Sequence, residues 1–150
     1  MKNMSTMSHS MTEPQEIFIM MMIMFIAGLL SSMNIWVDKL SDISFHLNDI
    51  YMALLMCGWS LLLMGIYYIN INLFSIGIIM TIIILYCIRK QVFIDEIEYV
   101  KGMIPHHSMA VFMSKQLLEK QNNSSKIKYL ATHIINTQEN EIKFMNKRLQ

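Results

Sequence analysis

The stretch from residue 102 to residue 113, GMIPHHSMAVFM, contains the side chains best suited to bind a metal. Two adjacent histidines, His106 and His107, lie among three methionines, Met103, Met109 and Met113. Imidazole and thioether together suit Cu(I) and also accept Cu(II), whereas zinc prefers histidine, cysteine and carboxylate ligands. This stretch is therefore a candidate copper site.

Helical periodicity gives each of these donors a direction. At about 100° per residue, residues 95–121 form a helix with one apolar face. His107 lies in the middle of that face and Met103 lies one turn earlier, so the two side chains can share one ion. His106 lies at the edge of the face, and Met113 can reach the pair from the following turns.

A second amphipathic helix is predicted over residues 126–149. Its apolar side has Met145 near the centre and can also offer Gln138 or Glu141 to the core, whereas His133 points away from it. The two helices together form a hairpin that can bring donors from both of them to one ion. The predicted metal ligands are Met103, His106, His107, Met113 and Met145.

Two residues mark local boundaries in this hairpin. Pro105 falls inside the first helix and lacks a backbone donor, so it should kink the helix or mark its effective start. The loop NNSS, residues 122–125, ends the first helix, and Ser125 is placed to cap the second.

A purely structural interpretation of the same residues remains open. In that interpretation His107 is a core histidine bonded to a carbonyl oxygen, and the methionines are packing. The N-terminal tail is a separate candidate, because it contains a regular array similar to the methionine motifs of copper importers, in which flexible thioethers capture Cu(I). A disordered polar tail is the alternative there. The array consists of Met1, Met4, Met7, His9 and Met11.

Three apolar runs determine the predicted architecture. Residues 17–37, 50–69 and 71–88 contain no charged side chain, and about 20 apolar residues suffice to cross a bilayer core. The only break between the last two runs is NIN, residues 70–72, which predicts a tight turn between two antiparallel helices. We expect an all-α integral membrane protein. Its predicted parts are an N-terminal tail (1–16), a three-span region (17–88) and a C-terminal helical hairpin (89–150).

Composition argues against several function classes. The chain of 150 residues has a net charge of +1, which gives no basic or acidic field for a nucleic-acid partner. Cys57 and Cys87 both lie in apolar runs and form neither a disulfide framework nor a CxxC motif. We find no nucleophile, base and oxyanion set in the sequence, so we do not expect an enzyme.

The segments MIPHHSMAVFM and IINTQENEIKFM together resemble the signature of the domain-of-unknown-function family 305. The resemblance covers residues 95–149 and implies a ferritin-like, helical protein, rich in methionine and histidine and associated with copper. The segment FHLNDIYMALLM (45–56) also resembles a membrane-anchored branch of that family. Unlike many members, this chain lacks an internal duplication. The resemblance implies metal-binding roles for Met103, His106, His107, Met113 and Met145.

The predicted topology rests on two opposing signals. Three spans place the tail and the hairpin on opposite sides of the membrane. Positive charge is more frequent near the hairpin, which favours a cytoplasmic hairpin; the charges compared are Lys2 on one side and Lys39, Arg89, Lys90 and Lys101 on the other. The family resemblance implies the reverse, and we follow it in expecting an extracytoplasmic hairpin.

A hairpin of about 60 residues buries too little surface to be stable alone. We therefore expect either that two chains pair their hairpins into a four-helix bundle, or that the hairpin docks on the loop 38–49. The function that best fits the sequence is that of a membrane-anchored protein that stores, buffers or hands over copper. The alternative is a structural or protein-interaction membrane protein without a metal.

Overall fold

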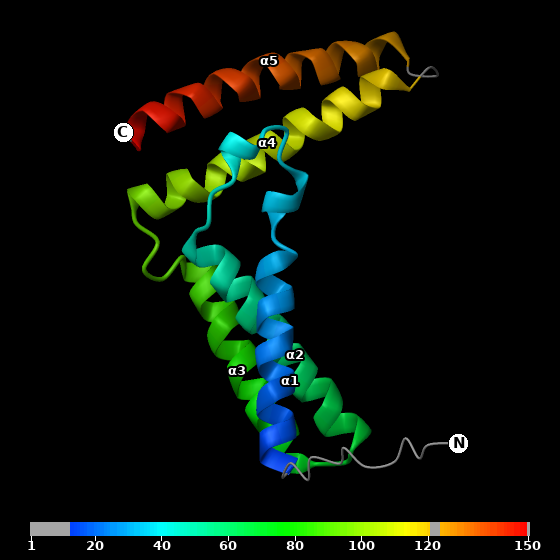
Figure 1. The fold of residues 1–150 in the computed structure, drawn as a ribbon, viewed down its shortest axis with the longest axis vertical. Coiled ribbons are helices and arrows are strands. Elements are labelled where there is room, and N and C mark those ends of the chain that lie inside the picture. The colour runs from blue at the N-terminus through cyan, green and yellow to red at the C-terminus, as the bar shows by residue number, and fades with distance from the viewer. Residues whose placement is uncertain (1–12, 121–123, 150) are drawn as a thin grey trace, which may run out of the picture.

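The computed structural model describes residues 13–120 and 124–149. These residues are all-α, as predicted, and Figure 1 shows three helices side by side in one bundle with the last two lying across one end of it. The predicted N-terminal metal-binding array, Met1 to Met11, lies outside the described residues. The elements are α1 (Glu13–Leu30), η1 (Met33–Trp36), η2 (Leu40–Asp42), α2 (Leu47–Tyr67), α3 (Ile71–Lys90), α4 (Glu96–Glu119) and α5 (Ser125–Arg148).

The first three helices are long and apolar enough to cross a membrane. Many of their apolar side chains point outward, among them Leu63, Ile79 and Ile82, each more than half exposed. A bundle with this surface suits lipid as its solvent better than water. The candidate spans are Pro14–Trp36, Leu47–Tyr67 and Ile71–Lys90.

The first span is close to the apolar run 17–37, since the candidate span is Pro14–Trp36. It is not one continuous helix: η1 forms its end at Met33–Trp36, and α1, which begins at Glu13, stops at Leu30. It stops because polar side chains begin to bond locally: Asn34 Nδ2 donates to Ser32 Oγ at 3.1 Å, and Asn34 Oδ1 accepts from the Ser44 N–H at 2.9 Å. Such bonds compete with the helical ladder.

The turn between α2 and α3 lies where the sequence predicted it. Asn70 caps α3, because its Oδ1 accepts from the N–H groups of Asn72 and Leu73 at 3.0 and 3.2 Å. Ile69 has a φ of 53°, a left-handed conformation that reverses the chain direction before the cap. The two helices therefore run antiparallel from one short turn.

Helices α4 and α5 form the predicted hairpin around a small apolar core of Ile104, Val111, Ile142 and Met145. Pro105 is buried within α4, which runs through it from Glu96, so it does not mark the effective start of the helix. The cap of α5 is Ser124, not Ser125 as predicted, because the Ser124 hydroxyl accepts from the Ile127 N–H.

The connection between α1 and α2 folds back onto α4. Ser108 lies at the centre of this contact: its Oγ accepts from the Asp38 N–H at 2.8 Å and donates to Asp42 Oδ2 at 2.7 Å. Trp36 packs edge-on against Phe112, with ring centroids 6.5 Å apart. Of the two arrangements expected for the hairpin, docking on the loop 38–49 is therefore observed within a single chain.

A lysine ties the same loop to both helices of the hairpin. Lys115 Nζ lies 2.7 Å from Asp38 Oδ2 and 3.2 Å from Glu139 Oε1. The hydrogen bond with Asp38 is the main reason that the pKa of Lys115 is raised. One cation on α4 thus links the loop to α5.

Replacing Ser108 with alanine should loosen this contact. Ser108 is fully buried, and its loss removes the hydroxyl donor of Asp42 Oδ2 and the acceptor of the Asp38 N–H, while Ser41 still donates to Asp42 Oδ1. We expect a loss of about 1–3 kcal/mol in the free energy of unfolding, which is the usual cost of an unsatisfied buried group. Thermal unfolding of the detergent-solubilised full chain measures it, with the exposed Ser125→Ala as control. Equal unfolding temperatures for both variants would contradict this account.

Candidate metal centre

The contact between His107 and Glu141 joins the two helices of the hairpin at the predicted site. His107 Nδ1 lies 2.9 Å from Glu141 Oε2. The imidazole is 14% exposed and the carboxylate 47% exposed, so the pair lies at the edge of the seam between α4 and α5. The two atoms are close, but their approach falls short of a well-directed hydrogen bond. The contact is therefore one of proximity, with the carboxylate on the Nδ1 side of the ring.

Burial lowers the pKa of His107 below its ordinary value. The Glu141 carboxylate raises that pKa and the neighbouring His106 lowers it, but desolvation is the largest effect. The imidazole is consequently neutral near pH 7. A neutral imidazole that turns Nδ1–H toward a carboxylate keeps its lone pair on Nε2, which is the usual arrangement of a metal-ligating histidine.

Two of the predicted methionines lie beside this pair. Met145 is 8% exposed and belongs to the hairpin core, and Met103 packs against that core. Met103 precedes His107 by one turn on α4, and Met145 follows Glu141 by one turn on α5. The structure thus places an imidazole, a carboxylate and two thioethers along one stretch of the seam.

The other two predicted ligands lie apart from this group. His106 is exposed, with its ring centroid 6.0 Å from that of His107. Met113 is 55% exposed, and six residues separate it from His107, which turns its side chain to another side of the helix. Met113 therefore does not join the seam within its own chain. His133 points away, as predicted, and stacks on Tyr129 with the ring planes 6° apart.

Comparison with known proteins identifies the hairpin. A family model described as "Domain of unknown function (DUF305)" matches residues 96–150. An uncharacterized protein of Acanthamoeba polyphaga mimivirus is 46% identical over 138 residues, which cover 89% of this chain and 90% of the viral protein. The chain belongs to the DUF305 family. No solved structure matches it significantly.

The DUF305 match covers α4, α5 and the loop between them. The viral relative extends the similarity over most of the chain, including the length of the three apolar helices. The DUF305 hairpin and the apolar bundle are therefore parts of one conserved length of chain in these two proteins, rather than an accidental fusion in one of them.

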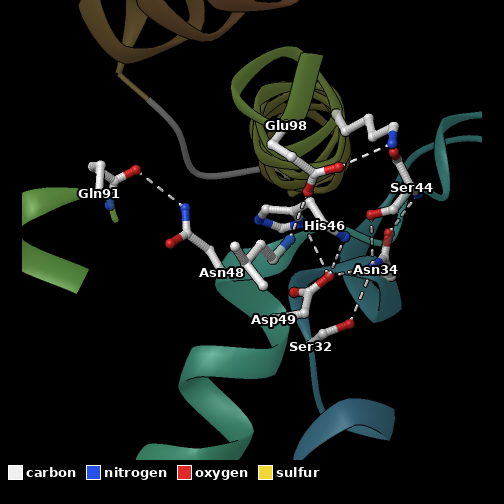
Figure 2. Close-up of polar contacts among 10 residues, drawn as sticks. Ser32, Asn34, Ser44, His46, Asn48, Asp49, Gln91 and Glu98 are labelled. Atoms are coloured by element: carbon white, nitrogen blue, oxygen red, sulfur yellow. Dashed lines mark hydrogen bonds and ion pairs between the residues drawn. The ribbon is translucent and has the colours of Figure 1, made fainter. Parts of the chain in front are cut away.

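The DUF305 hairpin rests on the bundle through a polar network that sequence reasoning missed. Figure 2 shows Glu98 of α4 above the first turn of α2, where its Oε2 accepts from the Leu47 N–H at 2.8 Å. Lys101 Nζ donates to the other carboxylate oxygen at 2.9 Å. These hydrogen bonds, from Lys101 first and Leu47 second, hold the pKa of Glu98 below its ordinary value.

A buried histidine lies in the same network. His46 Nδ1 lies 3.0 Å from Asp49 Oδ2, and both side chains are almost fully buried (Figure 2). A Cβ at Gly102 would lie 2.6 Å from Cδ2 of this imidazole, so a larger residue at this position would force the buried ring to shift. Gly102, the first residue of the stretch GMIPHH, thus lies where α4 rests on the bundle. The next residue, Met103, faces the seam.

Glu141 is the residue that sequence reasoning left out of the ligand set. It was recognised as a possible core donor because it lies on the apolar side of an amphipathic helix one turn before Met145. A carboxylate on the apolar side of this helix is the sequence feature that could have indicated its contact with His107. Within residues 13–120 and 124–149 no three histidine, cysteine, aspartate or glutamate side chains gather closely enough to hold a metal.

Proposed function

We propose that this DUF305 protein is a membrane-anchored copper-binding protein. The observation that carries the proposal is the seam of the hairpin, where His107 lies 2.9 Å from Glu141, and where Met103, one turn before His107, packs against the core that contains Met145. His107 supplies the nitrogen ligand through Nε2, and the two thioethers supply soft sulfur ligands. Glu141 supports the imidazole from behind.

The donor chemistry favours Cu(I) as the bound metal, with Cu(II) also possible. Thioether sulfur selects copper over zinc, and a zinc site would need three or four histidine, cysteine or carboxylate ligands. A carboxylate behind a histidine fixes the ring and raises its basicity, as in many metal sites. The resemblance of MIPHH to the copper-associated family signature supports the same assignment.

The position of the seam suits a role in buffering or handing over copper. Glu141 is 47% exposed, so an ion at His107 would lie near solvent rather than deep in a core. A second protein could reach such an ion, which permits exchange. Membrane anchoring through α1, α2 and α3 would keep that exchange at the bilayer surface. We place the hairpin on the extracytoplasmic side.

A structural role is the second candidate, and one observation favours it. The hairpin is fastened to the loop between α1 and α2 through Ser108 and Lys115, and His107 with Glu141 can be read as one more link between helices. In that case the purified wild type retains no copper, and replacing both histidines changes nothing in its metal content. Metal analysis of the purified full chain separates the two functions.

Single cysteines at the two ends of the bundle test the membrane topology. Leu40 and Ile69 are 84% and 93% exposed and lie at opposite ends of the three helices. In a chain freed of Cys57 and Cys87, an impermeant maleimide added to intact cells should label Leu40→Cys and not Ile69→Cys. After permeabilisation both should react.

The cysteine-free chain gives the background for that labelling. If Ile69→Cys alone reacts from outside, the hairpin is cytoplasmic and the proposed orientation is reversed. If both positions react from the same side, α2 does not cross the membrane.

A further inference from the structure

One side of α4 is largely apolar, with exposed side chains alternating with half-buried ones. No charged side chain occurs on it, and Tyr99 and Met113 are 56% and 55% exposed. His106 is also exposed there. We call these residues the open stripe: Tyr99, Met103, His106, Ala110, Met113 and Leu117.

Helix α5 continues this open surface beside the stripe. Leu130 and Phe144 are 51% and 66% exposed, and the charged residues on that side are Glu141 near its middle and Lys126 and Arg148 at the two ends of the helix. The rest of α5 is rich in charge, so an apolar strip here is a feature to be explained. Contiguous apolar surface of this kind usually marks a contact with another protein. The residues on this side of α5 are Ile127, Leu130, Ile134, Glu141 and Phe144.

The open stripe lies opposite the loop that joins α1 and α2. That loop contacts α4 at Ser108 and Phe112. Ser108 is two residues from both His106 and Ala110, and residues two apart point about 200° apart on a helix. In Figure 1 the loop covers the side of α4 nearest the viewer, and the hairpin lies across the end of the bundle. The stripe therefore faces sideways, parallel to the membrane surface, where a protein at the same height can reach it.

The spacing of the open stripe is symmetric. From Tyr99 to Leu117 the residues are separated by four, three, four, three and four positions, which reads the same in both directions. Two copies of α4 running antiparallel would therefore be in register with each other. Such pairing places Met103 opposite Met113 of the partner subunit, and the bulky His106 opposite a small Ala110 of the partner subunit.

Membrane anchoring would produce this antiparallel arrangement. Two chains in one membrane are related by a twofold axis along the membrane normal, the common symmetry of homodimers. That rotation reverses the direction of a helix that lies across the bundle, as α4 does (Figure 1). The open sides of the two hairpins then face each other, and their four helices form one bundle.

We propose that a second copy of this chain covers the open stripe, and that Met113 of the partner subunit completes the metal site. Within one chain Met113 points away from the seam, but antiparallel pairing brings it to Met103 and within a turn of His107. The exposed methionine thus becomes a thioether ligand supplied in trans. The pairing stands on geometry alone, whereas the role of Met113 rests on the proposed copper function.

Cysteine cross-linking tests the pairing without any metal. Two tagged chains, Met103→Cys and Met113→Cys, are co-expressed in a background lacking Cys57 and Cys87, and membranes are treated with diamide. We expect a disulfide between the two tagged chains. The matched control pair, Lys128→Cys with Lys143→Cys, is exposed but lies away from the open side and should not cross-link. Equal cross-linking of both pairs, or capture of a different protein at residue 113, would overturn the pairing.

Mixing two defective chains tests the role of Met113 in trans. His107→Ala and Met113→Leu are each expected to lose tight copper binding as homodimers. When the two chains mix at random, half of the dimers contain one chain of each kind. Each such dimer has one intact site out of two, so about one quarter of the wild-type sites should return. Retention of all copper by Met113→Leu, or no recovery on mixing, would overturn the role of Met113. Cross-linking without copper in the wild type would leave the pairing intact and refute the proposed function.

Discussion

Replacing His107 with alanine should abolish tight copper binding while the hairpin stays folded. In the proposed site His107 supplies the imidazole among the described residues of the seam, and Glu141 lies 2.9 Å from it. Loss of an outer partner alone typically costs 10–100-fold in metal affinity, so loss of the ligand itself should exceed roughly 100-fold. Titration of purified full chain with Cu(I) against a competing chelator measures the change, and circular dichroism verifies the helices.

Three further variants make that test specific. Met103→Leu should weaken copper binding, because leucine keeps a similar volume but lacks the thioether. Glu141→Gln should weaken copper binding about 10–100-fold, because it changes the outer partner of His107. His133→Ala is the control, since His133 stacks on Tyr129 away from the seam. If His107→Ala binds copper as tightly as the wild type with an intact fold, the site lies elsewhere. The methionines of residues 1–11 then become the leading candidate.

Replacing Gly77 with alanine should destabilise the bundle, although alanine is the better helix former. A Cβ at Gly77 would lie 2.4 Å from the backbone N of Leu62 and 2.7 Å from its Cα. Backbone atoms of a packed helix cannot move aside as a side chain can, so α2 and α3 must separate. Overpacking of this kind costs about 1–3 kcal/mol or more, against a gain of about 1 kcal/mol from helix propensity.

The sign of that change is the informative result. A lower unfolding temperature of the Gly77→Ala chain in detergent supports the close approach of α2 and α3, which small residues commonly permit in membrane proteins. Ser75→Ala, an exposed change in the same helix, should leave the temperature nearly unchanged. An unfolding temperature of Gly77→Ala at or above that of the wild type would show that the two helices do not touch there.

The kind and number of helices were predictable from the sequence. Runs without charge predict long apolar helices irrespective of their neighbours, because a charged side chain is costly in an apolar environment. Asn70 and the polar residues beside it predicted the turn between α2 and α3 in the same local way. The hairpin followed from periodicity, and so did the placement of His107 and Met103 on one face of α4.

The arrangement of the residues at the candidate site was only partly predictable. Periodicity predicted that His107, Met103 and Met145 lie toward the contact between α4 and α5 and that His133 lies away from it, and the structure places them so. It gave Met113 the same status as Met145, although Met113 is more than half exposed and Met145 is core. Periodicity fixes directions around one helix, but it does not say which face another helix will cover.

The tertiary structure alone decided how the hairpin is held. Asp38 meets Lys115 across 77 positions of sequence, and Asp42 meets Ser108 across 66. No local propensity reports such a contact, because each partner on its own is an ordinary polar residue of a loop or a helix. What selects the contact is the folded arrangement, in which a buried carboxylate must find a donor and the returning loop lies against the Ser108 side of α4. The sequence determined which segments are helices, and the need to satisfy buried polar groups between distant segments determined where the helices lie.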